Sequence, residues 1–307
     1  MRILLLGKNG QVGRALERAL APLAGPGELV ALDRKNGGDL AQLDTLAATV
    51  RQLRPQVIVN AAAYTAVDKA ESEPIQARLI NALAPEVLAK EAQALGAWLV
   101  HYSTDYVFDG SGTRAWVETD VTAPLNIYGQ SKLEGERLIQ AHCTRHLIFR
   151  TSWVYAAHGS NFAKTMLKLA QERERLTVID DQWGAPTGAA LISAVTATAI
   201  EKTSRAGDDA LGGLYHLAAS GGTNWHDYAS HVIGQAKALR PDLSWAVQEI
   251  APVPSSAFVT AARRPHNSRL DTHKLQAAFG IHLPDWQQGV DEMLAQVLTS
   301  TPSKETS

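Results

Sequence analysis

The chain has 307 residues, of which 45% are hydrophobic and 20% charged, with a formal net charge of -2. This balance is typical of a globular protein of one or two domains, and it gives no bulk attraction to nucleic acid or to an acidic membrane. Cys143 is the single cysteine, so no intrachain disulfide can form, and the absence of zinc-binding motifs or a long apolar run favours a metal-free cytoplasmic protein.

Short apolar runs alternate with alanine-rich amphipathic segments in the first half of the chain. We expect strands at 2–7, 28–33, 56–62, 97–105 and 146–152, and helices at 11–23, 43–53, 74–95 and from about 128. The strands show no polar alternation, as expected of strands covered on both faces. The pattern predicts an α/β fold, a Rossmann-type doubly wound parallel sheet with right-handed crossovers.

The pattern becomes less regular after about residue 150. Strand-like segments follow at 176–188 and 213–220, then a stretch of coil at 253–270 and a helix near 286–298. We therefore expect a dinucleotide-binding domain over 1–150, to which segments near 176–200 return. Residues 151–300 mainly form a smaller substrate-binding lobe over the carboxyl edge of the sheet, and 301–307 form a flexible tail.

The first strand ends in a turn with three glycines, Gly7, Gly10 and Gly13, and Gln11 and Val12 stand between the last two. Glycines at this spacing let the backbone turn tightly, approach a pyrophosphate and pack the next helix on the sheet. The helix N-terminus then offers free N–H groups to the phosphates. The turn predicts a nicotinamide dinucleotide, NADPH or NADH.

The second strand ends in Asp33 and Arg34. A carboxylate here binds ribose hydroxyls and favours NAD, whereas a guanidinium can hold the 2′-phosphate of NADP, so both cofactors stay open. Asp39 and Leu40 lie where they could contact adenine, although a solvated loop aspartate is the alternative.

The third strand ends in small residues that would not obstruct a flat ligand. Ala62 and Ala63 are therefore candidates for the floor of the cofactor site, and Thr65 lies just beyond them. Alanines that only pack at a strand end are the alternative.

Tyr128 and Lys132 stand four residues apart at the start of a helix, so they share one face of it. Thr104 ends the preceding strand at the same sheet edge. With the glycine turn upstream, this set resembles the extended branch of the short-chain dehydrogenase/reductase superfamily. The blocks "STDYVFDG", "PLNIYGQSKLEGE", "RTSWVYA", "DQWGAPTG" and "RRPHNSRL" are similar to the members that reduce dTDP-4-dehydro-6-deoxy-L-mannose to dTDP-L-rhamnose, for surface polysaccharide synthesis.

The resemblance implies that Tyr128 gives a proton to the ketone oxygen while Thr104 hydrogen-bonds it. A free tyrosine has a pKa of about 10, and we expect Lys132 to lower that of Tyr128 and to hold the nicotinamide ribose. Tyr106 stands where related dehydratases carry a glutamate base, which favours net reduction. Asp105 either tunes the site, contacts the sugar or caps the strand.

The resemblance also implies that Trp153 contacts the sugar, although a core tryptophan is the alternative. Arg264 and Arg269 are candidates to hold the nucleotide diphosphate of the substrate, because guanidinium groups bind phosphates bidentately.

Some members of this family join two subunits through magnesium bound by glutamates. The corresponding positions here are Ala15, Ala190 and Gln296, none of them a carboxylate. We expect a monomer or a weak homodimer without bridging magnesium, and no nucleic-acid or membrane partner.

Two other functions remain open from the sequence. One is epimerisation or dehydration of a sugar nucleotide with tightly held NAD, and the other is a non-catalytic regulatory subunit. The complete Thr–Tyr–Lys set favours catalysis.

Overall fold

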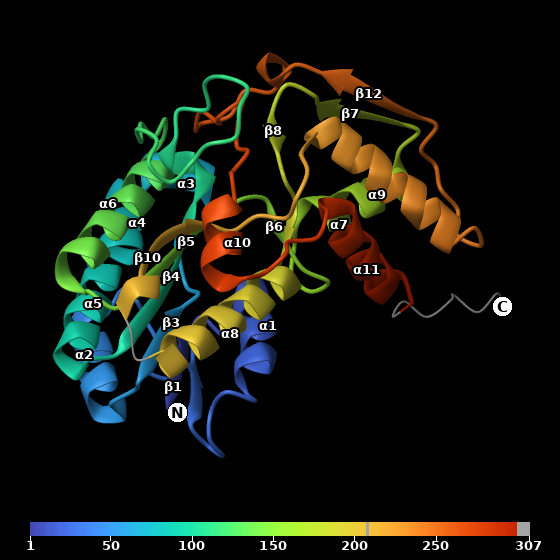
Figure 1. Cartoon of the computed structure of the whole chain (residues 1–307). Helices are drawn as coiled ribbons and strands as arrows, with labels where there is room; N and C mark the ends of the chain where they lie inside the picture. The colour runs from blue at the N-terminus through green and yellow to red at the C-terminus, as the bar shows by residue number, and fades with distance from the viewer. Residues whose placement is uncertain (207–208, 300–307) are drawn as a thin grey trace.

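The computed structural model describes residues 1–206 and 209–299, so the expected tail over 301–307 lies outside the described residues. A six-stranded parallel sheet in the order β10-β5-β4-β3-β1-β2 forms the centre of the larger lobe (Figure 1). Its strands are β1 (Ile3–Leu6), β2 (Leu29–Leu32), β3 (Val57–Asn60), β4 (Trp98–Thr104), β5 (His146–Thr151) and β10 (Gly213–His216). Every pairing in this sheet is parallel, and the predicted doubly wound α/β fold is confirmed.

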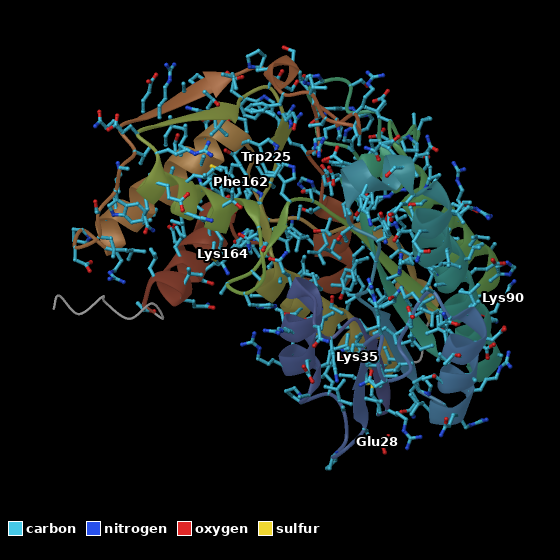
Figure 2. The ribbon with its side chains drawn as sticks, turned by 180° about the vertical axis from the view of Figure 1, so that it is seen from behind. Glu28, Lys35, Lys90, Phe162, Lys164 and Trp225 are labelled. Atoms are coloured by element: carbon cyan, nitrogen blue, oxygen red, sulfur yellow. The ribbon has the colours of Figure 1, made fainter. Side chains whose placement is uncertain are left out.

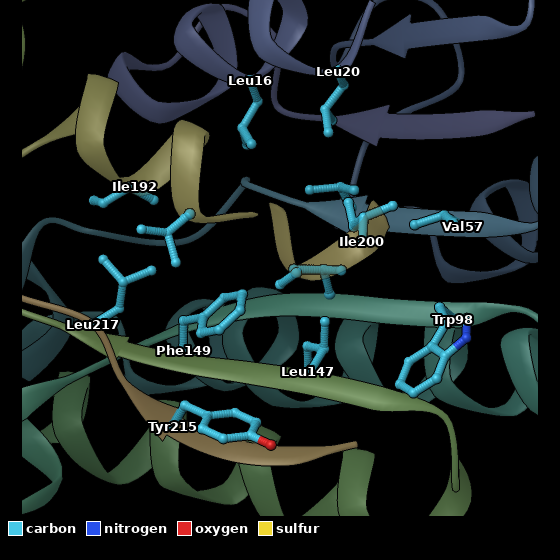
Figure 3. Close-up of a cluster of buried hydrophobic side chains, with 14 of the residues drawn as sticks. Leu16, Leu20, Val57, Trp98, Leu147, Phe149, Ile192, Ile200, Tyr215 and Leu217 are labelled. Atoms are coloured by element: carbon cyan, nitrogen blue, oxygen red, sulfur yellow. The ribbon is translucent and has the colours of Figure 1, made fainter. Parts of the chain in front are cut away.

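Successive strand residues point to opposite faces, and both faces are buried. Ile3 and Leu5 join the cluster under α1 (Gln11–Leu20), α8 (Ala189–Ala206) and α10 (His273–Phe279), which Figure 3 shows in close-up. Leu4 and Leu6 join the opposite cluster, under α2 (Leu43–Leu53), α5 (Ala84–Leu95) and α6 (Ile127–His142). The continuous apolar character of β1 follows from this double coverage.

The helix expected over 74–95 is interrupted by a π-helical turn. It consists of α4 (Pro74–Arg78), the π-helix η1 (Leu79–Leu83) and α5, with α3 (Val67–Ser72) just before. Asn81 in the π-helix donates to the Ser131 hydroxyl of α6 at 3.0 Å and accepts from Tyr64 N–H at 2.8 Å. The widened turn therefore fixes α6 against the sheet.

The smaller lobe has its own apolar cluster and lies to one side of the sheet edge (Figure 1). Its strands form two-stranded pairs, β12 with β7, β11 with β8, and β6 with β9. The remaining elements are β6 (Val154–Tyr155), α7 (Phe162–Glu172), β7 (Arg175–Ile179), β8 (Trp183–Gly184), β9 (Thr187–Gly188), β11 (Thr223–Asn224), α9 (Trp225–Leu239), β12 (Glu249–Val253) and α11 (Trp286–Thr299), with short 3-10 turns η2 (Asp105–Val107), η3 (Asp209–Leu211) and η4 (Ser255–Ala257).

Three segments from the second half of the chain complete the larger lobe. Helix α8 packs against α1, β10 pairs with β5, and α10 packs on β10 and α8. Residues 176–179, in contrast, belong to β7 of the smaller lobe. None of the described helices is both long and apolar enough to cross a bilayer.

Candidate active site

A cleft of about 970 Å³ opens at the carboxyl edge of the sheet and extends to the smaller lobe. Fifteen of the predicted site residues line it: Gly7, Gly10, Gln11, Val12, Asp33, Arg34, Ala62, Ala63, Thr65, Thr104, Asp105, Tyr106, Tyr128, Lys132 and Trp153. The parallel sheet brings them together because the carboxyl ends of its strands share one edge.

The glycine turn forms a tight cradle at one end of the cleft. Gly7 has a φ of 84°, and a Cβ there would lie 2.7 Å from the Ala62 nitrogen. No side chain caps the start of α1 at Gly10, so its first N–H groups are available to an anion. Gly13 does not line the cleft, because it packs under the Gly7 carbonyl, where a Cβ would overlap. These features fit the pyrophosphate of a dinucleotide.

Asp33 and two cations face the cleft beyond the turn. The Asp33 carboxylate accepts hydrogen bonds from Lys35 N–H at 2.9 Å and from the Asn9 amide at 2.8 Å, and both lower its pKa. Arg34 and Lys35 line the same end, and sequence reasoning missed Lys35. The end of the cleft therefore offers an acceptor for hydroxyls and cations for a phosphate.

The structure does not bring Asp39 and Leu40 into the cleft. Asp39 Oδ1 accepts from Ala41 N–H at 3.0 Å, and Leu40 is buried in the cluster that includes Leu46 of α2. The expected adenine contact is replaced by a local turn and by core packing.

Tyr128 and Lys132 lie on the first turns of α6, which begins after Asn126. The Asn126 side chain accepts from Gly129 N–H at 2.8 Å and caps the helix. Burial and the charge of Asp105 raise the pKa of Tyr128 to about 12, against a hydrogen bond with Thr104 that lowers it. The phenol is therefore protonated at neutral pH.

The expectation that Lys132 lowers the pKa of Tyr128 is wrong, because that pKa is raised and Lys132 does not contribute to the shift. Lys132 is 1% exposed, and its Nζ donates to the Tyr102 carbonyl at 2.5 Å and lies 3.1 Å from His101 Nε2. The Lys132 side chain is thus directed toward β4 rather than toward the phenol.

Asp105 and Tyr106 follow Thr104 at the cleft wall. Thr104, not Asp105, caps η2, because its hydroxyl oxygen accepts from Tyr106 N–H at 3.1 Å. Asp105 Oδ1 accepts from the Thr104 hydroxyl at 3.1 Å, and hydrogen bonds with Ser268 and Thr104 favour the ionised form of the buried carboxyl group. Burial raises the pKa of Asp105 to about 7. The Tyr106 ring meets that of Tyr128 edge-on, with centroids 5.9 Å apart.

Trp153 closes the cleft on the side of the smaller lobe. Its φ is 48°, its ring stacks on Trp225 at a centroid distance of 3.6 Å, and its other face lies against Gly184. Trp225 is held by a hydrogen bond from its indole N–H to Gln182 at 3.2 Å and packs beside Phe162 (Figure 2). Sequence reasoning missed Trp225, for which the capping Asn224 just before it is the only local signal.

The two predicted arginines do not line the cleft. Arg264 forms an ion pair with Asp68 of α3 at 2.6 Å, and a hydrogen bond with Tyr106 holds it next to the cleft wall. Arg269 donates to Asn267 Oδ1 at 2.9 Å and lies over the Trp183 ring.

A parallel Rossmann-type sheet, a glycine turn before the first helix and a Thr–Tyr–Lys set at the strand edge together define a short-chain dehydrogenase/reductase of the extended kind. Residues 1–299 match the family model described as RmlD substrate binding domain, and the chain belongs to this family.

Curated relatives cover almost the whole chain. A dTDP-4-dehydrorhamnose reductase from Shigella flexneri is 56% identical over 98% of this chain and 99% of its own. Its counterpart from Burkholderia thailandensis is 45% identical over 97% of this chain and 100% of its own.

Solved structures of dTDP-4-dehydrorhamnose reductases are also similar to this chain over nearly its whole length. The dTDP-4-dehydrorhamnose reductase of Clostridium acetobutylicum is 32% identical, with a TM-score of 0.87 over 97% of this chain and 99% of that one. The Bacillus anthracis enzyme, solved with NADP, is 33% identical, with a TM-score of 0.84 over 96% of this chain and 99% of that one.

Proposed function

We propose that this protein is a dTDP-4-dehydrorhamnose reductase. It reduces the C4 ketone of dTDP-4-dehydro-6-deoxy-L-mannose to give dTDP-L-rhamnose, with NADH or NADPH, for surface polysaccharide synthesis. The observation that carries the proposal is the placement of Tyr128, Thr104 and Lys132 in one cleft that runs from the glycine turn to Trp153. High identity to named reductases over the full chain supports the same activity.

The bound cofactor supplies a hydride for the ketone carbon. Tyr128 then donates its proton to the ketone oxygen as negative charge develops there, and Thr104 orients that oxygen with its hydroxyl. The neighbouring Tyr106 offers no carboxylate base to remove a proton next to the ketone, which favours reduction over elimination. Asp105 and Trp153 line the same cleft, where they would contact the sugar.

Both cofactors fit the far end of the cleft. Asp33 would accept the ribose hydroxyls of NADH, and Arg34 with Lys35 would hold the 2′-phosphate of NADPH. The main-chain N–H groups at the start of α1 would bind the pyrophosphate of either.

The decisive experiment follows the absorbance of NADH and of NADPH with a small panel of nucleotide-linked 4-ketosugars. A reductase consumes one reduced cofactor per sugar, and we expect dTDP-4-dehydro-6-deoxy-L-mannose to be the best substrate. Conversion of a nucleotide sugar without net loss of reduced cofactor would instead indicate an epimerase or a dehydratase.

A further inference from the structure

A row of buried polar side chains connects β3, β4 and α6 beneath the cleft. Asn60 and His101 are paired positions of β3 and β4, so their side chains share one face of the sheet. Lys132 reaches them from α6. The three residues are 0%, 1% and 1% exposed, and the reaction proposed above gives Asn60 and His101 no role.

The direction of the hydrogen bonds along this row is set at Asn60. Its Oδ1 accepts the N–H of Ala62 at 3.2 Å, so the amide nitrogen faces His101. An amide nitrogen can only donate, and His101 Nδ1, at 3.2 Å, must therefore accept. A neutral imidazole that accepts at Nδ1 carries its proton on Nε2.

The proton on Nε2 points at Lys132, whose Nζ is 3.1 Å away. An ammonium group has donors and no acceptor, so it would meet this N–H donor to donor, whereas a neutral amine has a lone pair that accepts it. Either form can donate to the Tyr102 carbonyl. A doubly protonated His101 is disfavoured, because burial holds its pKa well below its usual value.

Burial of Lys132 also brings its titration into the range below pH 8.5, where the neutral amine becomes the main form. Burial lowers its pKa to about 8 although Glu136 raises it, and the charge of Glu136 is matched by a two-bond pair with Arg150 at 2.9 and 2.7 Å. A hydrogen bond donated to the amine lowers the pKa further. The titratable or charged groups around this row are His101 of β4, Tyr128 and Glu136 of α6, Asp105 of η2 and Arg150 of β5.

We propose that the Asn60–His101 pair holds Lys132 as a neutral amine in the cofactor-free protein, and that Lys132 takes up one proton from solvent when the nicotinamide dinucleotide binds. The inference rests on the proposed function, because it requires a nicotinamide cofactor. The dinucleotide brings negative charge and hydroxyl oxygens into the cleft, and both favour the ammonium form. Asn60 and His101 are positioning residues, acting through Lys132.

Proton uptake is measured directly by isothermal titration calorimetry of NADH binding at pH 8.5, in two buffers with different enthalpies of ionisation. At this pH Asp105 is largely ionised, and NADH has no 2′-phosphate to titrate. We expect the wild-type protein to take up close to one proton per NADH, and Lys132→Met to take up none. Binding of NADH to the wild-type protein with the same heat in both buffers would overturn the proposal.

Two variants test the pair itself. In Asn60→Asp the carboxylate still accepts from Ala62 N–H, and it also accepts a hydrogen bond from His101 Nδ1. His101 Nε2 then has no proton and accepts from Lys132, which is stabilised as an ammonium. Because Lys132 is already charged, proton uptake on NADH binding should fall close to zero. His101→Gln offers Lys132 an amide oxygen and is expected to lose uptake too. Tyr128→Phe is the matched control, because it should keep uptake.

Unchanged uptake in both pair variants would refute the role of Asn60 and His101. Loss of uptake in Tyr128→Phe would place the proton on the phenol instead. A wild-type protein that binds neither NADH nor NADPH would refute the proposed function, and the inference with it.

Discussion

At the scale of single residues, the raised pKa of Tyr128 suits the proposed role of proton donor. A phenol with a pKa of about 12 holds its proton at neutral pH, and in the proposed reaction it would lose that proton as charge develops on the substrate oxygen. The buried Asp105 helps to maintain this state, because its negative charge opposes ionisation of the phenol.

Replacement of Tyr128 by phenylalanine removes the proton donor and little else, since the ring and its edge-on contact with Tyr106 remain. We expect kcat to fall by about 10² to 10⁴, the usual contribution of general acid catalysis, while cofactor binding stays within about threefold. Steady-state kinetics together with fluorescence titration of NADPH would measure both, and wild-type turnover in the variant would exclude Tyr128 as the donor.

Asp105 should make stability depend on pH. Its carboxyl group keeps its proton up to about pH 7 in the native state and only to about pH 4 when unfolded. The native state thus binds more protons between these values, and the free energy of unfolding falls as the pH rises through this range. Asp105→Asn should then stabilise the cofactor-free protein by on the order of 2 to 4 kcal/mol at pH 8, and by less at pH 5.

Urea unfolding of this variant at the two pH values tests the expectation. Asp109→Asn is the control, because hydrogen bonds from Ser111 lower the pKa of that exposed carboxylate, and its removal should not stabilise the protein. An equal effect of Asp105→Asn at pH 5 and pH 8 would contradict the pKa shift.

At the scale of elements, Gly184 of β8 packs against one face of the Trp153 indole. A Cβ at Gly184 would lie 2.7 Å from Trp153 Cε2, and Trp225 covers the opposite face, so the indole has no room to move away. We expect Gly184→Ala to raise KM for the nucleotide sugar by about tenfold or more, because small displacements in a site are costly, with cofactor affinity unchanged.

The matched control for this variant is Gly222→Ala, just before β11. A Cβ there would meet its nearest neighbour, Arg269 Cδ, at an ordinary 3.5 Å. Its kinetics should match those of the wild type, and equal KM values in the two variants would argue against the role of β8.

The local elements around the cofactor end of the site could be predicted from the sequence, because glycine spacing and buried apolar runs leave local signals. The place of β10 in the sheet could not, since residues 213–216 pair with β5, more than 60 positions earlier. The stacking of Trp225 on Trp153 and the hydrogen bond from Lys132 to β4 likewise join residues that lie far apart in the sequence. The pKa of Tyr128 depends on burial, which a motif does not contain.

At the scale of the whole molecule, the expected assembly without bridging magnesium can be tested in solution. Ala15, Ala190 and Gln296 carry no carboxylate, so we expect no subunit contact that depends on a bridging metal ion. We expect light scattering with size-exclusion chromatography to give the same mass with and without EDTA. A lower mass in EDTA would reveal a metal-dependent dimer.

The chain crosses between the lobes several times, because α8 and β10 belong to the larger lobe although they follow β6–β9 in the sequence. Ile192 and Ile200 of α8 and Tyr215 of β10 share an apolar cluster with Leu16 and Leu20 of α1 (Figure 3). Neither lobe is therefore formed by one continuous segment that could be exchanged by itself. A change of sugar specificity has to come from point substitutions around the Trp153–Trp225 stack, because grafting another enzyme's carboxyl-terminal half would also replace one edge of the nucleotide-binding sheet.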